Sequence, residues 1–408
     1  MTSRDRVLTT LRHEEPDKVP IDFGAMRSTG IMAIAYNRLK AYLGLRGGYT
    51  RVYDVPQQLA EPEPAILERF QVDVVDLANT MGRHPEEWLP WTLPDGSLAH
   101  VHRSCYPVKR NGQWVLMEGE RVAARMPAGV LYFESCNPPL AQATSSRDIT
   151  AYPWPVLTDE MLRLLEEQAK FLYFETEYAV MGGFGGNILE LGQSLRGWDT
   201  FMMDLAGNRA FAEDLMDTMV EVHLKNLHAY LQAVGDYIQL IQMGDDLGTQ
   251  KGPQLSPDMY RELIKPRHKA VYQYVKQHSK VHVFLHSCGS IYALIPDLIE
   301  AGVEVLNPVQ TSAQDMDPAR LKHEFGDRLT FWGGGIDTQH LLPEGKPEEI
   351  AAQVEERLRI FAPGGGYVFT QVHNVQANVP PENVVAAYDA AIRARDYPIS
   401  PAGKGGRR

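Results

Sequence analysis

The chain has 408 residues, of which 44% are hydrophobic and 23% are charged, with a formal net charge of −12. These values predict a globular protein with a packed core, and the acidic balance argues against a surface for nucleic acid or anionic membranes. The sequence lacks an N-terminal apolar run and any stretch of about 18 apolar residues, so we expect neither a signal peptide nor a membrane span. Three widely spaced cysteines then predict free thiols in a cytoplasmic protein.

The first predicted element is a short helix over 3–13 with Ser3 as its N-cap. Two short strands, 19–23 and 72–77, follow, with helical segments at 30–44 and 61–70. From about 90 to 135, Pro94-Asp-Gly96 and Asn111-Gly112 separate short alternating runs, which is the pattern of hairpin turns. We therefore predict an antiparallel β insertion at about 90–135, between the second and third strands.

Strands and helices alternate from there to the end of the chain. The predicted strands are 178–184, 237–244, 281–287, 303–309, 329–335 and 367–373, and the predicted helices are 208–234, 257–278, 290–300, 347–361 and 381–394. With the two early strands this makes eight, which predicts a (β/α)8 TIM barrel of the α/β class over residues 1–396, followed by a loose tail at 397–408. A doubly wound sheet is the alternative, but the glycine-rich stretch 182–186 lacks the spacing of a dinucleotide-binding loop.

The active site of such a barrel lies at the C-terminal ends of the strands. Polar residues are concentrated at these ends and are sparse at the opposite ends, which favours an enzyme over a structural protein. The candidate residues at the C-terminal ends are Asp22, Arg27, Asn187, Glu190, Asp245, Asp246, His286, Cys288, Asn307, Gln310, Asp337, Gln371 and His373.

A candidate metal site begins with His286 and Cys288, which are two residues apart and share one face of an extended strand. Imidazole and thiolate are both ligands for zinc. Strand eight lies three places from strand five around the ring, so we predict His373 as the third ligand. Taken singly, each histidine could be an ordinary hydrogen-bonded residue and Cys288 a small buried hydrophobe. His282, at the start of the same strand, is predicted to lie in the barrel floor.

The carboxylates also have two interpretations. Glu190 or Asp245 is a candidate for a catalytic role, in positioning a substrate or moving a proton. The alternatives are structural: Asp245 caps the following segment, and Glu190 responds to a helix dipole.

Several motifs resemble the uroporphyrinogen decarboxylase superfamily over nearly the whole chain. They are Gly244-Asp-Asp-Leu-Gly-Thr-Gln-Lys-Gly-Pro253, His286-Ser-Cys-Gly289, Glu304-Val-Leu-Asn-Pro-Val-Gln310, Phe331-Trp-Gly-Gly-Gly-Ile-Asp337 and Pro381-Glu-Asn383. The resemblance implies the same (β/α)8 barrel. True decarboxylases carry an arginine-rich signature, Met-Arg-Gln-Ala-Gly-Arg, that binds the porphyrinogen carboxylates. Here Gly24-Ala-Met-Arg-Ser-Thr-Gly30 keeps Arg27 and lacks the second arginine, which argues against that substrate.

The chain is more similar to the cobalamin-dependent methyltransferase branch, which shares the His-x-Cys on strand five. In that branch a cysteine on strand eight completes a zinc site, and by spacing from Glu382-Asn383 the residue at this position here is His373. The resemblance therefore implies zinc on His286, Cys288 and His373, a corrinoid on a partner protein that docks over the barrel mouth, and a homodimer. Fewer thiolates make the zinc a harder Lewis acid, which favours an oxygen or nitrogen ligand over a thiol.

The resulting prediction is a zinc-dependent methyltransferase that demethylates a small methoxy or methylamine-type substrate. Its predicted substrate-binding residues are Asp22, Arg27, Asn187, Gln310 and Gln371. One alternative is a metal-independent decarboxylase or lyase, in which Arg27 and Asp22 hold a small carboxylic acid. A non-catalytic binding protein is another, and a zinc hydrolase is disfavoured because no histidine pair follows strand one.

Overall fold

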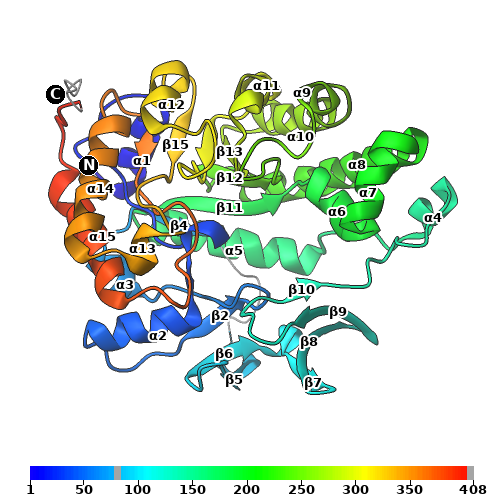
Figure 1. Cartoon of the computed structure of the whole chain (residues 1–408), viewed down its shortest axis with the longest axis horizontal. Coiled ribbons are helices and arrows are strands. Elements are labelled where there is room, and N and C mark those ends of the chain that lie inside the picture. The colour runs from blue at the N-terminus through cyan, green and yellow to red at the C-terminus, as the bar shows by residue number, and fades with distance from the viewer. Residues whose placement is uncertain (78–83, 402–408) are drawn as a thin grey trace.

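Seven of the eight predicted strand segments form one parallel sheet in the computed structural model, which describes residues 1–77 and 84–401. The strand order is β16-β15-β14-β13-β12-β11-β4, so strands that follow one another in the chain also pair. The strands are β4 (Val74–Asp76), β11 (Ala179–Gly185), β12 (Leu240–Gly244), β13 (His282–His286), β14 (Val305–Asn307), β15 (Thr330–Trp332) and β16 (Tyr367–Val368). The sheet is curled, as in a TIM-barrel-like α/β fold (Figure 1).

Residues 19–23, predicted as the first strand, do not form a regular strand. Ile21 makes an isolated parallel bridge to Phe369, just after β16, and its carbonyl accepts a hydrogen bond from the backbone N–H of Asp73, just before β4. The segment therefore connects the two edges of the sheet. Its ladder is incomplete because Pro20 has no N–H to donate and the N–H of Ile21 is bonded to the carboxylate of Asp73.

The interior of the curled sheet is filled by one side chain or more from each strand. This cluster is apolar and fully buried, and its strand members are Val74, Ala179, Met181, Leu240, Phe284, Val305, Trp332 and Val368. Val7 and Leu11 of α1 (Ser3–Leu11) pack against it. Ser3 bonds to Asp73, and Arg4 bonds to the carbonyl of Tyr178, so α1 covers the N-terminal ends of the strands.

Helices cover the outer face of the sheet (Figure 1). The helices that follow strands or connect them are α3 (Pro64–Arg69), α5 (Asp159–Glu175), α8 (Arg209–Val234), α10 (Lys265–His278), α11 (Ile295–Ala301), α12 (Pro318–Phe325), α14 (Pro347–Phe361) and α15 (Pro381–Ala394). The others are α2 (Ala33–Tyr42), α4 (Ser146–Ala151), α6 (Leu189–Arg196), α7 (Trp198–Gly207), α9 (Pro257–Met259) and α13 (Leu341–Glu344).

Two helix starts show how local sequence sets the boundaries. Ser256 caps α9 by accepting the N–H of Met259, and a π-helical turn at Tyr260–Ile264 joins α9 to α10. The predicted cap Ser3 of the first helix is wrong by one residue, because Thr2 is the N-cap and accepts the N–H of Asp5.

The region 90–135 is divided between two small sheets at the lower edge of the molecule in Figure 1. One has the order β1-β3-β2-β6-β5, in which β5 and β6 pair antiparallel but β6 pairs in parallel with β2. The other is antiparallel, in the order β10-β9-β8-β7. The predicted Asn111-Gly112 turn joins β7 to β8, with φ of 49° and 81°. The strands are β1 (Ile31–Met32), β2 (Arg51–Asp54), β3 (Leu59–Ala60), β5 (Trp88–Thr92), β6 (Leu98–His102), β7 (Val108–Arg110), β8 (Gln113–Glu118), β9 (Arg121–Met126) and β10 (Glu134–Ser135).

The C-terminal segment predicted as a loose tail is described only as far as residue 401, since 402–408 lie outside the described residues. Tyr397, at its start, donates its backbone N–H to the carbonyl of Asp17 and its hydroxyl to the carbonyl of Ala362. Among the helices that the structure describes, none has the length and apolar character needed to cross a membrane.

Candidate metal centre and adjacent cavity

Three potential metal ligands meet at the C-terminal ends of the strands. His286 ends β13, Cys288 follows two residues later, and His373 lies in the loop after β16. The Nε2 atom of His286 is 3.4 Å from Sγ of Cys288, and one ligand atom from each of the three residues lies within 4.8 Å of the others. A tetrahedral zinc ion places its ligand atoms about 3.3–3.8 Å apart, so small side-chain movements would complete the geometry.

A buried amide fixes the orientation of His286. Nδ1 of His286 is 2.6 Å from Oδ1 of Asn307, and Nδ2 of Asn307 donates to the carbonyl of Trp332, which sets the amide orientation. Because an amide oxygen only accepts, Nδ1 carries the proton and Nε2 presents its lone pair towards Cys288. The hydroxyl of Ser28 also donates to the same Asn307 oxygen.

Cys288 and His373 are uncharged when no ion is bound. Burial, and then the neighbouring His286, lower the pKa of His373 to about 4, so its imidazole is neutral at pH 7. Burial and the nearby Asp246 and Glu190 carboxylates raise the pKa of Cys288, which keeps it a thiol. A bound cation would reverse this effect and favour the thiolate.

Two acidic residues lie beside the three ligands. Oδ1 of Asp246 accepts the N–H of Cys288 at 2.7 Å and lies 3.6 Å from Nε2 of His286. Burial, followed by the charges of Asp245 and Asp246, raises the pKa of Glu190 to about 8. Glu190 therefore holds a proton at neutral pH, and the side-chain amide of Asn187 donates to it.

Asp245 makes structural contacts at the start of α6. Its carboxylate accepts the backbone N–H groups of Ile188, Leu189 and Glu190 at the start of α6 and lies 3.0 Å from Nε2 of His268. The residue is fully buried. These contacts occupy both oxygens, so Asp245 is the cap that the structural alternative described.

Two predicted substrate-binding residues are likewise engaged inside the protein. Asp22 accepts hydrogen bonds from Trp332 and from the N–H of Ala25, and burial raises its pKa to about 6. Gln371 donates to the carbonyl of Thr29 and accepts the hydroxyl of Tyr388. Both side chains connect the loops around the barrel mouth.

The remaining predicted residues line hollows at the mouth. Gln310 borders a groove with His373, and its side chain accepts the N–H of Gly289. Asn187 and Glu190 line a second hollow. His282, predicted for the barrel floor, lies 3.3 Å from Glu304 at the N-terminal end of β13.

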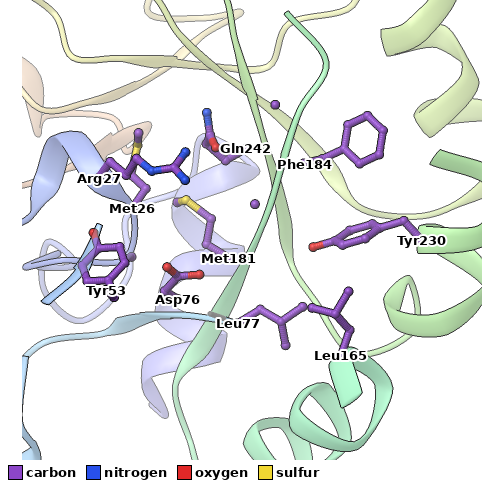
Figure 2. A pocket seen from close by; sticks show the side chains of 13 residues that line it. Met26, Arg27, Tyr53, Asp76, Leu77, Leu165, Met181, Phe184, Tyr230 and Gln242 are labelled. Carbon is purple, nitrogen blue, oxygen red and sulfur yellow. The ribbon is translucent and has the colours of Figure 1, made fainter. Parts of the chain in front are cut away.

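Arg27 lines a cavity of about 250 Å³ bounded by β4, β11 and β12 (Figure 2). Its Nε lies 2.5 Å from Oδ2 of Asp54. The next residue, Ser28, bonds to Asn307 and thereby connects this cavity to His286. The cavity is lined by Ala25, Met26, Arg27, Tyr53, Asp76, Leu77, Leu165, Met181, Gly183, Phe184, Gly185, Tyr230 and Gln242.

Sequence reasoning did not assign a role to several of these residues. Alternation along β12 places Leu240 and Gln242 on the inner face, and the same rule places Asp246 there rather than Asp245. The signal for Asp246 was therefore present in the sequence. Tyr53 and Tyr230 come from β2 and α8, outside the parallel sheet, and had no such signal.

The curled parallel sheet and the three converging ligands define a TIM-barrel-like protein with a candidate metal centre at its mouth. The chain belongs to the uroporphyrinogen decarboxylase (URO-D) family, whose profile matches residues 126–394, more than half of the chain. This family membership confirms the predicted superfamily.

Among solved structures, a methyltransferase from Methanosarcina mazei is similar over 96% of this chain and 99% of that chain, with 18% identity and a TM-score of 0.59. At this identity the likeness shows the shared fold. A D-psicose 3-epimerase, solved in the presence of D-fructose, matches 61% of this chain and 84% of that chain, with 12% identity and a TM-score of 0.30, too low to support an argument. No curated protein matches the sequence.

Proposed function

We propose that the protein is a zinc-dependent methyltransferase on a (β/α)8-type barrel, in which residues 19–23 close the ring between β16 and β4. It would move a methyl group from a small methoxy or methylamine-type substrate to a corrinoid carried by a partner protein. The observation that carries this proposal is the convergence of His286, Cys288 and His373 at the mouth. Its supports are the URO-D family and the fold shared with a methyltransferase.

The donor set fits a catalytic zinc ion. Two imidazoles and one thiol form a borderline-soft ligand set, and three protein ligands leave a fourth position for a substrate. Asn307 provides the hydrogen bond to His286 that metal-binding histidines normally make through their second ring nitrogen. Asp246 lies close enough to orient a substrate, or to take the fourth position after a side-chain movement.

A bound zinc ion would supply Lewis-acid polarisation of the heteroatom that carries the methyl group. Glu190, protonated because burial raises its pKa to about 8, holds a proton beside Asp246 that can pass to the leaving heteroatom. Asn187 positions this carboxyl group through its side-chain amide. Asp245 supports Glu190 indirectly, because it binds the Glu190 backbone N–H at the start of α6.

The second candidate, a metal-independent decarboxylase or lyase of a small acid, rests on Arg27, which lines a cavity at the mouth. It requires Asp22 as well, and the Asp22 carboxyl group is bonded to Trp332 and Ala25 in the core. Arg27 is itself paired with Asp54. The converging ligands therefore favour the methyltransferase.

Metal content tests the proposal first. The purified protein is expected to hold one zinc per chain by mass spectrometry of the metals, and Cys288→Ala and His373→Ala are expected to lose it. The matched controls are Cys136→Ala, at a partly buried thiol in the small antiparallel sheet region, and His323→Ala, at an exposed histidine of α12. Both controls should keep the ion.

Methyl transfer tests it second. Reduced free cobalamin, mixed with the zinc-loaded protein and a methoxy or methylamine compound, should show the absorbance change of cobalt methylation. Turnover of a small acid by the chelated protein, with no zinc in the purified wild type, would instead establish the lyase.

A further inference from the structure

The cavity beside the candidate metal centre is small and lies at the same barrel mouth. Its volume of about 250 Å³ is below the range of roughly 300–1,000 Å³ found for drug-sized ligands. Figure 2 shows Arg27 and Asp76 on one side, Phe184 and Tyr230 on the other, and Met181 and Gln242 between them. A ligand that fits is therefore a compact molecule, far smaller than a tetrapyrrole.

The charges around this cavity disfavour an anionic ligand. Arg27 is the cation and Asp76 the carboxylate among its described lining residues. The Arg27 guanidinium is paired at 2.5 Å with Asp54, and 66% of the Arg27 side chain is exposed, so its charge is neutralised and hydrated. An anionic ligand would face two carboxylates, Asp54 and Asp76, around a single arginine that is already paired. An uncharged ligand avoids this cost.

Two phenol hydroxyls in the lining have no hydrogen-bond partner among the residues that the structure describes. The hydroxyls of Tyr53 and Tyr230 are buried and unpaired, and Tyr230 as a whole is only 2% exposed. Figure 2 shows the Tyr230 hydroxyl directed into the cavity. A side chain at Gly182 would collide with that hydroxyl, so the glycine makes room for the hydroxyl itself. An unpaired buried hydroxyl is costly, and a ligand hydroxyl would remove that cost.

The rest of the lining suits a flat ring. The aromatic rings of Phe184 and Tyr230 have centroids 5.7 Å apart, and Met181 and Leu77 are buried apolar neighbours. Nε2 of Gln242 donates to the carbonyl of Met243, and its Oε1 can accept a hydrogen bond from a ligand. The surroundings therefore combine aromatic and sulfur contacts with hydrogen-bonding groups for a hydroxyl.

We infer that this cavity binds a small, uncharged methoxylated phenol, whose ring packs against Phe184 and Tyr230 and whose hydroxyl bonds to Tyr230. The inference rests on the proposed function, and it names the substrate class of that site. It selects phenols over carboxylic acids.

Binding of 2-methoxyphenol to the wild-type protein, measured by calorimetry, tests the inference, with 2-methoxybenzoate and N-methylbenzylamine as probes of similar size. The phenol is expected to bind tightest of the three. Tyr230→Phe should weaken phenol binding about two- to tenfold, the worth of one neutral hydrogen bond. The same variant should leave the thermal stability of the ligand-free protein equal or higher, because it removes an unpaired hydroxyl. Tyr272→Phe, at another buried unpaired hydroxyl outside the cavity, is the control and should leave binding unchanged.

Tighter binding of the benzoate or the amine, or equal weakening by Tyr230→Phe and Tyr272→Phe, would overturn the inference. The same titration in Cys288→Ala separates it from the proposed function. Phenol binding that survives there and remains sensitive to Tyr230→Phe supports the cavity assignment even if the protein transfers no methyl group. Methyl transfer from a methylamine without phenol binding would leave the function standing and the inference refuted.

Discussion

Oδ1 of Asn307 lies 2.6 Å from Nδ1 of His286, on the side of the imidazole opposite to Cys288. The amide is fully buried and cannot turn over without losing its bond to the carbonyl of Trp332. The adjacent strands β13 and β14 pair His286 with Asn307 in register, so the contact is a direct result of the sheet. The barrel framework thus sets which ring nitrogen is available to a metal.

Asn307→Leu is expected to weaken zinc binding about 10- to 100-fold, because His286 loses the partner that fixes its tautomer. Asn307→Asp keeps an acceptor for Nδ1 of His286 and should therefore lose less zinc affinity than Asn307→Leu. Competition with a chromophoric chelator measures both affinities, and unfolding of the metal-free variants in urea separates stability from affinity. Equal zinc affinity in Asn307→Leu and the wild type would show that the contact does not tune the site.

Zinc binding at pH 7 is expected to release about one proton per ion. The raised pKa of Cys288 makes it a thiol in the metal-free protein, and the thiolate is the ligand, whereas His286 and His373 bind in their neutral forms. Calorimetry in buffers of different ionisation enthalpy measures the number. His373→Cys, which replaces an imidazole by a second thiol, should retain zinc and release about two protons per ion. A value near zero for the wild type would exclude Cys288 as a ligand.

Asp245→Asn and Asp246→Asn should have opposite consequences. Asp245 caps α6 and contacts His268 while fully buried, so its substitution should lower the free energy of unfolding by about 1–3 kcal/mol. Asp246 has a partly exposed side chain beside His286, so its substitution should change zinc affinity or methyl transfer with little loss of stability. Urea unfolding and zinc titration of both variants check the contrast. The reverse pattern would support the catalytic role predicted for Asp245.

The pH dependence of stability should reveal the raised pKa of Glu190. Its folded-state pKa of about 8 lies above the ordinary value of 4.5, so between these pH values the folded protein keeps a proton that the unfolded chain releases. Glu190 therefore makes the metal-free protein less stable as pH rises from about 5 to 8. Glu190→Gln should remove this contribution to the pH dependence, so the stability of the variant should rise relative to that of the wild type between about pH 5 and pH 8. Parallel stability curves for the two proteins would contradict the raised pKa.

The candidate ligands could be predicted because they follow simple periodic rules. His286 and Cys288 lie two apart on a strand, and His373 follows the strand that closes the other side of the sheet. The same rule, applied to β12, would have assigned Asp246 to the mouth and Asp245 to the outside. The rule was not applied to the pair, because Asp245 and Asp246 are adjacent, identical in chemistry and just beyond the last regular residue of the strand.

Other features depend on contacts that no local pattern encodes. Residues 19–23 alternate like a strand, but Pro20 and the side chain of Asp73 remove the ladder bonds that a strand needs. The hairpin at 88–102 was recognised from its turn, whereas its partner β2 lies in a separate part of the sequence and pairs in parallel. Tyr53 and Tyr230 reach the cavity from outside the parallel sheet, and this depends on tertiary packing.

The helix α1 fills the far end of the barrel, where Val7 and Leu11 pack into the interior cluster. Substrate and partner would therefore approach the three ligands from the side where the strands end. In the proposed reaction, a small donor and a large carrier protein would both approach from that side of the barrel. The carrier would cover the donor once it arrives, so the chemistry would require an order: the small molecule enters first and its demethylated product departs last.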